Sequence, residues 1–478
     1  MSLLIAVEIA LGRFQFSLIF VGIVGFASIF ILTYKRVAFP YLLIFVLGLE
    51  QFQIPFLNLA ELGTISKFGG GILLICYLLS RQISGHTFFT KKISARFVPL
   101  IAYILYSTMS LQWSNSPQNL LLAASTYILI FMLALMVIDF IEEQSDLKHF
   151  IWALFVYAFF VSLSGIYQVY SGRLDIQSAN TLIDQYRANL LGNANDIAAH
   201  MAMGVGLILS VFGLKRNNFI ADVSLPIHEQ VKNNNSINRL LLIAQDHIST
   251  PFSFYANSRL LVLLGCILPI IIIGILTTGS RGGIVALICA VILVTPRTIR
   301  QPIFPLTIFT SLFLVLVAYF VFPEPFIIFL DRFNVDLSNP EAASGERLTM
   351  LRIALSIFSE SPIWGSGLTR FQFHPKNPFG IIAHGSLQSI LAEGGIIGIT
   401  LFISGLVLTF HGLIRSIQMK AEPVTIGLRD IAYMLFISLG TLCVAFIFLD
   451  GQADKIFWIL LALSNSTIVM TQREMVYT

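Results

Sequence analysis

Long apolar runs with few charges recur along the whole chain, and they constrain its fold more than any other feature. Of 478 residues, 56% are hydrophobic and only 11% are charged, against about a quarter charged in soluble domains. A membrane-spanning helix needs about 20 mostly apolar residues, whereas the alternating pattern of a transmembrane barrel does not occur. We therefore predict an all-α, polytopic transmembrane helical bundle. A soluble enzyme, a disordered chain and a nucleic-acid-binding protein are excluded.

Thirteen apolar segments can be marked in the sequence. The segment 282–295 is short and Lys67 interrupts 64–80, so we expect about 12–13 spans. The four cysteines are far apart inside apolar runs, which favours packing roles over disulfides or a metal site. The segments are 14–34, 38–57, 64–80, 97–113, 120–138, 150–170, 197–214, 260–278, 282–295, 303–321, 396–414, 431–449 and 456–470.

The distribution of Lys and Arg predicts how the chain is oriented. Of the 29 cations, 18 fall in one alternate set of connections, and cytoplasmic connections carry the excess of positive charge. This rule places the N-terminus outside and the C-terminus in the cytoplasm. Two connections are long: 215–258 is a polar linker expected in the cytoplasm, and 322–395 is a loop expected outside.

The outer loop 322–395 has amphipathic character. Leu348, Leu351, Leu355 and Phe358 recur at helical spacing, and a turn rich in Gly and Pro follows them. An amphipathic helix beside a membrane tends to lie in the interface. We expect short interfacial helices in this loop.

Arg281 stands in a hairpin on the outer side, where cations are disfavoured. Gly282 and Gly283 follow it directly, at the point where a helix is expected to begin. Backbone N–H groups at such a point bind anions, and a guanidinium adds a planar fork that fits phosphate oxygens. An interfacial Arg that extends to water beside a tight glycine turn fits the same sequence. Both interpretations stay open.

Arg187 is a second outer arginine, placed shortly before the span that begins near residue 197. Asn195 and Asp196 are interpreted as N-cap residues of that helix. Arg187 has no comparable local role, although pairing with Asp184 or Asp196 is an alternative.

His384 lies near the end of the outer loop. A histidine titrates near neutral pH and can take a proton from a hydroxyl group. An interfacial polar role fits it as well, and His374 in the same loop is its main competitor. Glu393 is expected to cap or pair near the next span.

In order, these elements resemble the O-antigen ligase/polymerase family. The resemblance covers about residues 150–398 by motif and the rest by hydropathy. It is carried by Arg187 with Gly192-Asn193-Ala194-Asn195-Asp196, by Ser280-Arg281-Gly282-Gly283, by Gly345-Glu346-Arg347, by Ser361-Pro362-Ile363-Trp364-Gly365-Ser366-Gly367, by His384 and by Ala392-Glu393-Gly394-Gly395.

The resemblance implies a membrane glycosyltransferase that uses a glycan linked to polyprenyl (undecaprenyl) diphosphate. It implies a multi-pass protein of the bacterial inner (plasma) membrane with its active site on the periplasmic side, acting in lipopolysaccharide or surface polysaccharide biosynthesis. Residues 38–478 would form the ligase-like membrane domain, and 1–37 an extra N-terminal span. The expected partners are the lipid-linked glycan, a lipid or glycan acceptor and the bilayer; no nucleic acid, cofactor or metal is expected.

Residue roles follow from the resemblance by position. Arg187 and Arg281, with Gly282 and Gly283, would hold the diphosphate, and His384 would activate the acceptor hydroxyl. Fixed cations meet the charge of a leaving diphosphate without a metal, so we expect inverting, metal-independent transfer. Lesser candidates for glycan or phosphate contact are Arg347, Arg352 and Arg370. The chain departs from the family at Gly385, where the family usually has Asn.

Several functions compete with the ligase interpretation. A polymerase performs the same chemistry on another lipid-linked repeat, and a third branch of the family glycosylates protein hydroxyls. A small-solute transporter shares the hydropathy, but transport predicts ionisable residues near mid-membrane. The candidates here lie at the outer interface, which favours the enzyme.

Overall fold

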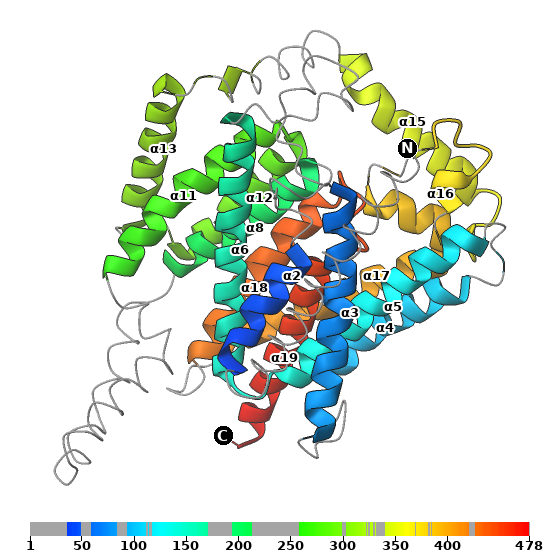
Figure 1. The fold of residues 1–478 in the computed structure, drawn as a ribbon, viewed down its shortest axis with the longest axis horizontal. Helices are drawn as coiled ribbons and strands as arrows, with labels where there is room; N and C mark the ends of the chain where they lie inside the picture. The colour runs from blue at the N-terminus through cyan, green and yellow to red at the C-terminus, as the bar shows by residue number, and fades with distance from the viewer. Residues whose placement is uncertain are drawn as a thin grey trace, which may run out of the picture.

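The computed structural model is built from helices, with no strand among the residues that it describes (Figure 1). Those residues are 36–48, 59–83, 93–110, 113, 117–170, 194–212, 258–298, 303–321, 323, 326–327, 330, 340–368, 370–380, 383, 385–419 and 426–477. The helices are α2 (Phe39–Gly48), α3 (Leu59–Ile83), α4 (Val98–Met109), α5 (Pro117–Phe140), α6 (Gln144–Tyr170), α8 (Ala194–Phe212), α11 (Ser258–Thr278), α12 (Arg281–Thr298), α13 (Ile303–Val321), α15 (Pro340–Phe358), α16 (Arg370–Phe373), α17 (Ser386–Gln418), α18 (Ile426–Ala445) and α19 (Lys455–Tyr477), with 3-10 turns η1 (Arg36–Ala38) and η3 (Ala95–Phe97).

The predicted all-α polytopic membrane protein is confirmed. Five helices are long and apolar enough to cross a membrane, in α6, α8, α12, α17 and α18, and six shorter apolar stretches of helix accompany them among the described residues. Each predicted apolar segment from 38–57 onward overlaps one of the helices. The predicted span 14–34 and most of the predicted linker, 215–257, lie outside the described residues.

Helix α8 is the centre of the bundle. Nearly all of its residues are buried, and it contacts α6, α11, α12 and α18. Small residues permit this: a Cβ atom on Gly204 would lie 2.4 Å from the Cβ atom of Ala158 on α6, and one on Gly206 would lie 3.0 Å from Ile437 on α18. Close backbone approach through small residues is how helices associate where lipid removes the hydrophobic drive.

Large apolar side chains face outward on the perimeter. Helix α13 packs against α11 at one edge of the bundle (Figure 1). Its Phe309 and Phe320 are 70% and 74% exposed. Such an outward apolar face is stable in lipid, not in water.

Ion pairs mark one end of the bundle. Arg81, in the last turn of α3, binds Asp139 at 3.2 Å and Glu142 at 3.3 Å. Arg297, at the end of α12, binds Asp430 on α18 at 2.6 Å. Both arginines belong to the cationic set that we predict to be cytoplasmic. Because Arg297 lies at the end of α12, the start of α12 lies toward the opposite end of the bundle. The starts of α8 and α19 lie at that same end, since α8 contacts both the start of α12 and Asp454, the residue before α19.

The outer segment contains the predicted helix, α15, which also has a buried face that the leucine spacing did not indicate. Leu348 and Leu355 are about half exposed. A separate small core forms instead, made of Met350, Ile353, Ala354, Ile357, Phe371, Ala383 and Ala392. Helices α15 and α16 lie at one side of the bundle near α17 (Figure 1). Helix α17 therefore covers the face of α15 opposite the leucines, and Leu348 and Leu355 stay exposed.

Candidate active site

The start of α12 is fixed to the first turn of α8. Ser280 is the residue before α12, and its Oγ accepts the N–H of Gly283 at 3.0 Å. The same Oγ donates to Asn195 Oδ1 at 2.7 Å. The serine therefore caps one helix and ties it to the other. Asn195 lies inside α8, which begins at Ala194, so its side chain serves this tie and not the cap that we expected.

Arg281 is the first residue of α12 and is partly exposed. The glycines after it allow close packing. A Cβ atom on Gly283 would lie 2.4 Å from Ala198 Cβ on α8, and one on Gly282 would lie 3.4 Å from Phe448 Cβ. Both glycines are helical, and the left-handed turn is made by Gly279 at φ 58°. Arg281 thus projects from a rigidly held helix start, where the helix dipole favours anions.

Residues 446–454 connect α18 to α19, and we refer to them as the α18–α19 segment. This segment holds the start of α17. The Ser386 N–H donates to the Phe446 carbonyl at 3.0 Å, Ser386 Oγ donates to the Leu449 carbonyl at 2.8 Å, and the Gly451 N–H donates to Ser386 Oγ at 2.7 Å. His384 lies outside the described residues, two positions before this anchored serine.

Gly385 packs against the same segment. A Cβ atom on Gly385 would lie 2.6 Å from the Ile447 carbonyl oxygen, a distance that backbone atoms do not tolerate without moving. Its φ of −169° is open to any residue, so the constraint is space. This contact gives a physical reason for glycine where the family usually has Asn.

Phe448 joins the outer helix α15 to the start of α12. Its Cβ atom faces Gly282, and the guanidinium carbon of Arg347 lies 5.5 Å from its ring centroid. A cation over an aromatic ring contributes about 0.5–1 kcal/mol at exposed sites. Arg347, a predicted contact residue, is thereby held beside the start of the helix that carries Arg281.

Asp450 is a partly buried residue of the α18–α19 segment that the sequence patterns did not indicate. Its Oδ1 has no hydrogen-bond partner within the described part of the chain. Burial raises the pKa of Asp450 to about 7, against hydrogen bonds from Ser389 and Gln452 that lower it. Ser389 lies on the first turn of α17, so this carboxyl group faces the helix start that follows His384.

Tyr157, His200 and Asp454 form a second polar group that the sequence did not reveal. The Tyr157 hydroxyl lies 2.9 Å from His200 Nδ1, and His200 Nε2 lies 2.9 Å from Asp454 Oδ2. Asp454 also caps α19, since its Oδ1 accepts the Phe457 N–H at 2.7 Å. Burial acts to raise the pKa of Asp454, but His200 and the Phe457 N–H outweigh it and hold the pKa below its ordinary value.

The two Gly-rich motifs of the outer loop bind each other. Helix α17 is broken at Gly395, which has φ 62°. The carbonyls of Ala392 and Glu393, freed by the break, accept the N–H groups of Ser366 at 3.0 Å and Gly367 at 2.9 Å. In return, the Ile396 N–H donates to the Pro362 carbonyl at 2.9 Å. The turn 361–367 thus replaces the missing helical hydrogen bonds, and we call this contact the interlock.

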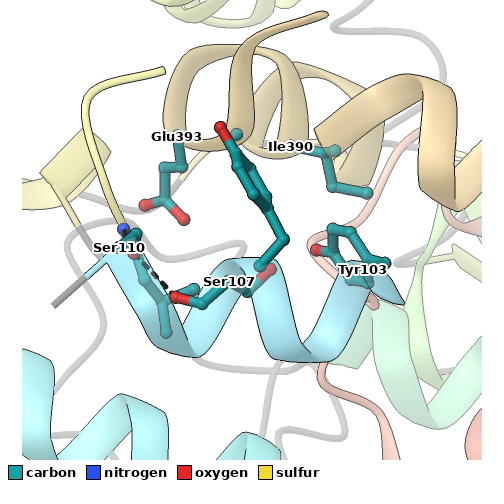
Figure 2. Close-up of a pocket in the computed structure, with 8 residues that line it drawn as sticks. Tyr103, Ser107, Ser110, Ile390 and Glu393 are labelled. Atoms are coloured by element: carbon teal, nitrogen blue, oxygen red, sulfur yellow. Dashed lines mark hydrogen bonds between the residues drawn. The ribbon is translucent and has the colours of Figure 1, made fainter. Parts of the chain in front are cut away.

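Glu393 faces a small polar cavity between α17 and α4. Figure 2 shows its carboxylate directed toward the end of α4, where Ser107 and Ser110 lie. Glu393 accepts the Phe371 N–H at 3.2 Å, and Ser110 Oγ accepts the Leu368 N–H at 2.9 Å. The cavity has about 10 Å³, room for about one water. It is too small for a sugar and serves to join the outer segment to the bundle.

The remaining candidates are spread around this region. Arg352 is exposed on α15, Arg370 begins α16, and Arg187 lies outside the described residues. His374 is buried and held by Glu360 at 3.2 Å. Glu360 also binds Lys376 at 2.8 Å, a contact that lowers the pKa of Glu360. Within the described ranges, no three His, Cys, Asp or Glu residues form a metal-binding group.

Comparison with known protein families matches residues 265–403 to O-antigen ligase. No curated protein matches the chain. The match begins inside α11 and ends inside α17. It therefore contains Arg281 with its two glycines, helix α15, and both halves of the interlock. Residues 265–403 therefore carry the similarity to O-antigen ligase that the sequence motifs indicated.

Proposed function

We propose that this protein transfers a glycan from a polyprenyl (undecaprenyl) diphosphate carrier to an acceptor hydroxyl at the periplasmic face of the bacterial inner membrane. One observation carries the proposal. The start of α12, with Arg281, and the start of α17, next to His384, are both held by the α18–α19 segment. The proposed cation for the leaving group, and the helix start that follows the proposed base, are thus attached to one segment.

Arg281 would bind the diphosphate of the donor. The guanidinium is permanently charged and presents several N–H groups in a plane, which suits phosphate oxygens. The positive, N-terminal end of the α12 dipole adds to the electrostatic attraction of the guanidinium for phosphate. The N-terminal end of α8 lies directly beside the start of α12. Arg187 precedes α8 and would supply a second cation. Charge that develops on the departing diphosphate is then met by fixed groups.

His384 would act as general base. The acceptor hydroxyl attacks the anomeric carbon from the face opposite the diphosphate, a C–O bond forms, and the bond to the diphosphate oxygen breaks. The hydroxyl proton passes to His384, and the carrier leaves as the diphosphate. One displacement inverts the anomeric centre. Because the cations stabilise the leaving group, this route needs no metal; a positioned base contributes about 10²–10⁴-fold.

Three further arginines would contact the glycan or its phosphates. Arg347 is the best placed of them, since it lies over Phe448 next to the start of α12. Arg352 is exposed five positions further along α15. Arg370 begins α16, which contacts α17.

The surface glycans of a deletion strain, complemented with variants, test the proposal. Arg281→Ala and His384→Ala are expected to abolish glycan transfer at normal protein levels, while Arg473→Ala, an exposed arginine at the other end of the bundle, is expected to restore it. Loss of the O-chain from lipid A–core identifies a ligase, and a single attached repeat identifies a polymerase. An unchanged glycan with altered solute uptake would contradict the proposal.

A further inference from the structure

A chain of polar groups, two of them buried and the third partly exposed, runs from α6 through α8 to the start of α19. It consists of Tyr157, His200 and Asp454, joined by contacts of 2.9 Å each. His200 is 2% exposed and Tyr157 3% exposed. Neither the proposed donor site nor the proposed base uses these residues.

This chain is fully connected. Both ring nitrogens of His200 have partners, and Asp454 uses one oxygen for His200 and the other for the Phe457 N–H. A buried polar group without a partner costs several kcal/mol, and apolar side chains of similar volume in place of a buried ionic group often stabilise a protein as well or better. The three polar side chains therefore indicate that the helices and the segment they join must keep a fixed relative position.

The geometry that it fixes is that of the α18–α19 segment. Asp454 is the last residue of this segment, and His200 ties it to the central helix α8 at a point 254 residues away in the sequence. Toward its other end, the same segment places Phe448 against Gly282 and binds Ser386. A displacement of Asp454 would therefore move the support of Arg281 together with that of Ser386, which follows His384 by two positions.

We propose that Tyr157, His200 and Asp454 are positioning residues that hold the two halves of the transferase site in register. The proposal rests on the proposed function for its catalytic readout. The positioning of the α18–α19 segment can be tested independently of glycan transfer, because its position can be measured without substrate.

Trp458 supplies that measurement. Its Nε1 donates to the Gln452 carbonyl, inside the α18–α19 segment, at 2.8 Å, and its side chain is buried. A protein in which Trp113, Trp152 and Trp364 are replaced by Phe reports fluorescence from Trp458 alone. Movement of the segment changes the emission of this tryptophan.

The main variant is Tyr157→Phe, which removes one hydroxyl group from the chain and little volume. Its matched control is Tyr433→Phe, which removes the hydroxyl that donates to the Val294 carbonyl at 3.2 Å on the same bundle. We expect Tyr157→Phe to lower kcat about tenfold and to shift Trp458 emission, because a displacement near 1 Å reduces rates by up to about 10²-fold. The control is expected to change kcat less than about twofold and to leave the emission unchanged.

A pair of His200 variants adds a rescue test. His200→Gln keeps a donor and an acceptor, and we expect it to retain more activity than His200→Ala. Wild type and Arg281→Ala, assayed in parallel, decide the proposed function by themselves: no transfer by wild type, or full transfer by Arg281→Ala, would overturn it. If transfer is present but Tyr157→Phe and Tyr433→Phe behave alike in kcat and in emission, the positioning proposal is wrong.

Discussion

Gly365→Ala is the most informative test of the interlock. Gly365 has φ 72°, and a Cβ atom there would lie 2.1 Å from the Glu393 carbonyl oxygen and 2.5 Å from the Gly395 nitrogen. The left-handed backbone alone costs a non-glycine residue about 1–2 kcal/mol. The overlap with backbone atoms cannot be relieved by a side-chain rotation, so the turn must move away from α17.

The consequence can be estimated from the hydrogen bonds that such a movement breaks. The Ser366 N–H to Ala392 and the Gly367 N–H to Glu393 bonds lie next to the overlap. Each contributes about 1 kcal/mol, and a buried group left unsatisfied costs about 1–3 kcal/mol. With the backbone strain, Gly365→Ala should destabilise the protein by roughly 3–6 kcal/mol.

Gly380→Ala is the matched control, because Gly380 has φ +64° but nothing within 4 Å of a Cβ atom. Its free energy of unfolding should fall only by the cost of the left-handed backbone, about 1–2 kcal/mol. Thermal unfolding of the purified protein in detergent measures both variants against wild type. If the two alanines lower the midpoint equally, backbone overlap at the interlock is not the cause and the reasoning fails.

Two other residues give predictions of their own. Asp450 has a pKa near 7 when folded against about 4 when unfolded, so the stability that its protonated form contributes is lost as the pH rises from about 4 through 7. Relative to wild type, Asp450→Asn should gain about 1–4 kcal/mol between pH 5 and pH 8, and thermal unfolding at both pH values checks this; an equal effect at both would contradict the shift. Gly385→Asn restores the family's usual residue but places its Cβ atom 2.6 Å from the Ile447 oxygen. We expect at least about tenfold slower transfer from misplacement of His384, measured in the complemented deletion strain, and wild-type transfer would refute the packing argument.

Local sequence patterns predicted the helices well. Helix α13 spans Ile303–Val321, the same residues as the predicted segment, and the break of α17 at Gly395 directly precedes the predicted span 396–414. Apolar length and glycine positions determine these features locally. The face of α15 was not predictable, because the leucine spacing does not reveal that α17 and Phe371 cover the opposite side.

In the candidate site, too, residues in local motifs were predictable from the sequence and contacts between distant residues were not. Arg281 and its capping serine stand in a short motif, so the sequence could point to them. His200 and Asp454 are separated by 254 residues, and a single histidine within an apolar run has no local signal. The glycines of the outer motifs stood out in the sequence, yet their mutual role appears only when Gly365 and the break at Gly395 are placed together.

We propose that Arg281 binds the leaving diphosphate. The most direct measurement is the rate of glycan transfer by purified protein from a polyprenyl-diphosphate donor, for wild type, Arg281→Ala, Arg281→Lys and the control Arg473→Ala. We predict a loss of at least about 10²-fold for Arg281→Ala, partial activity for Arg281→Lys, and wild-type rates for Arg473→Ala. Transfer by Arg281→Ala at the wild-type rate would contradict it.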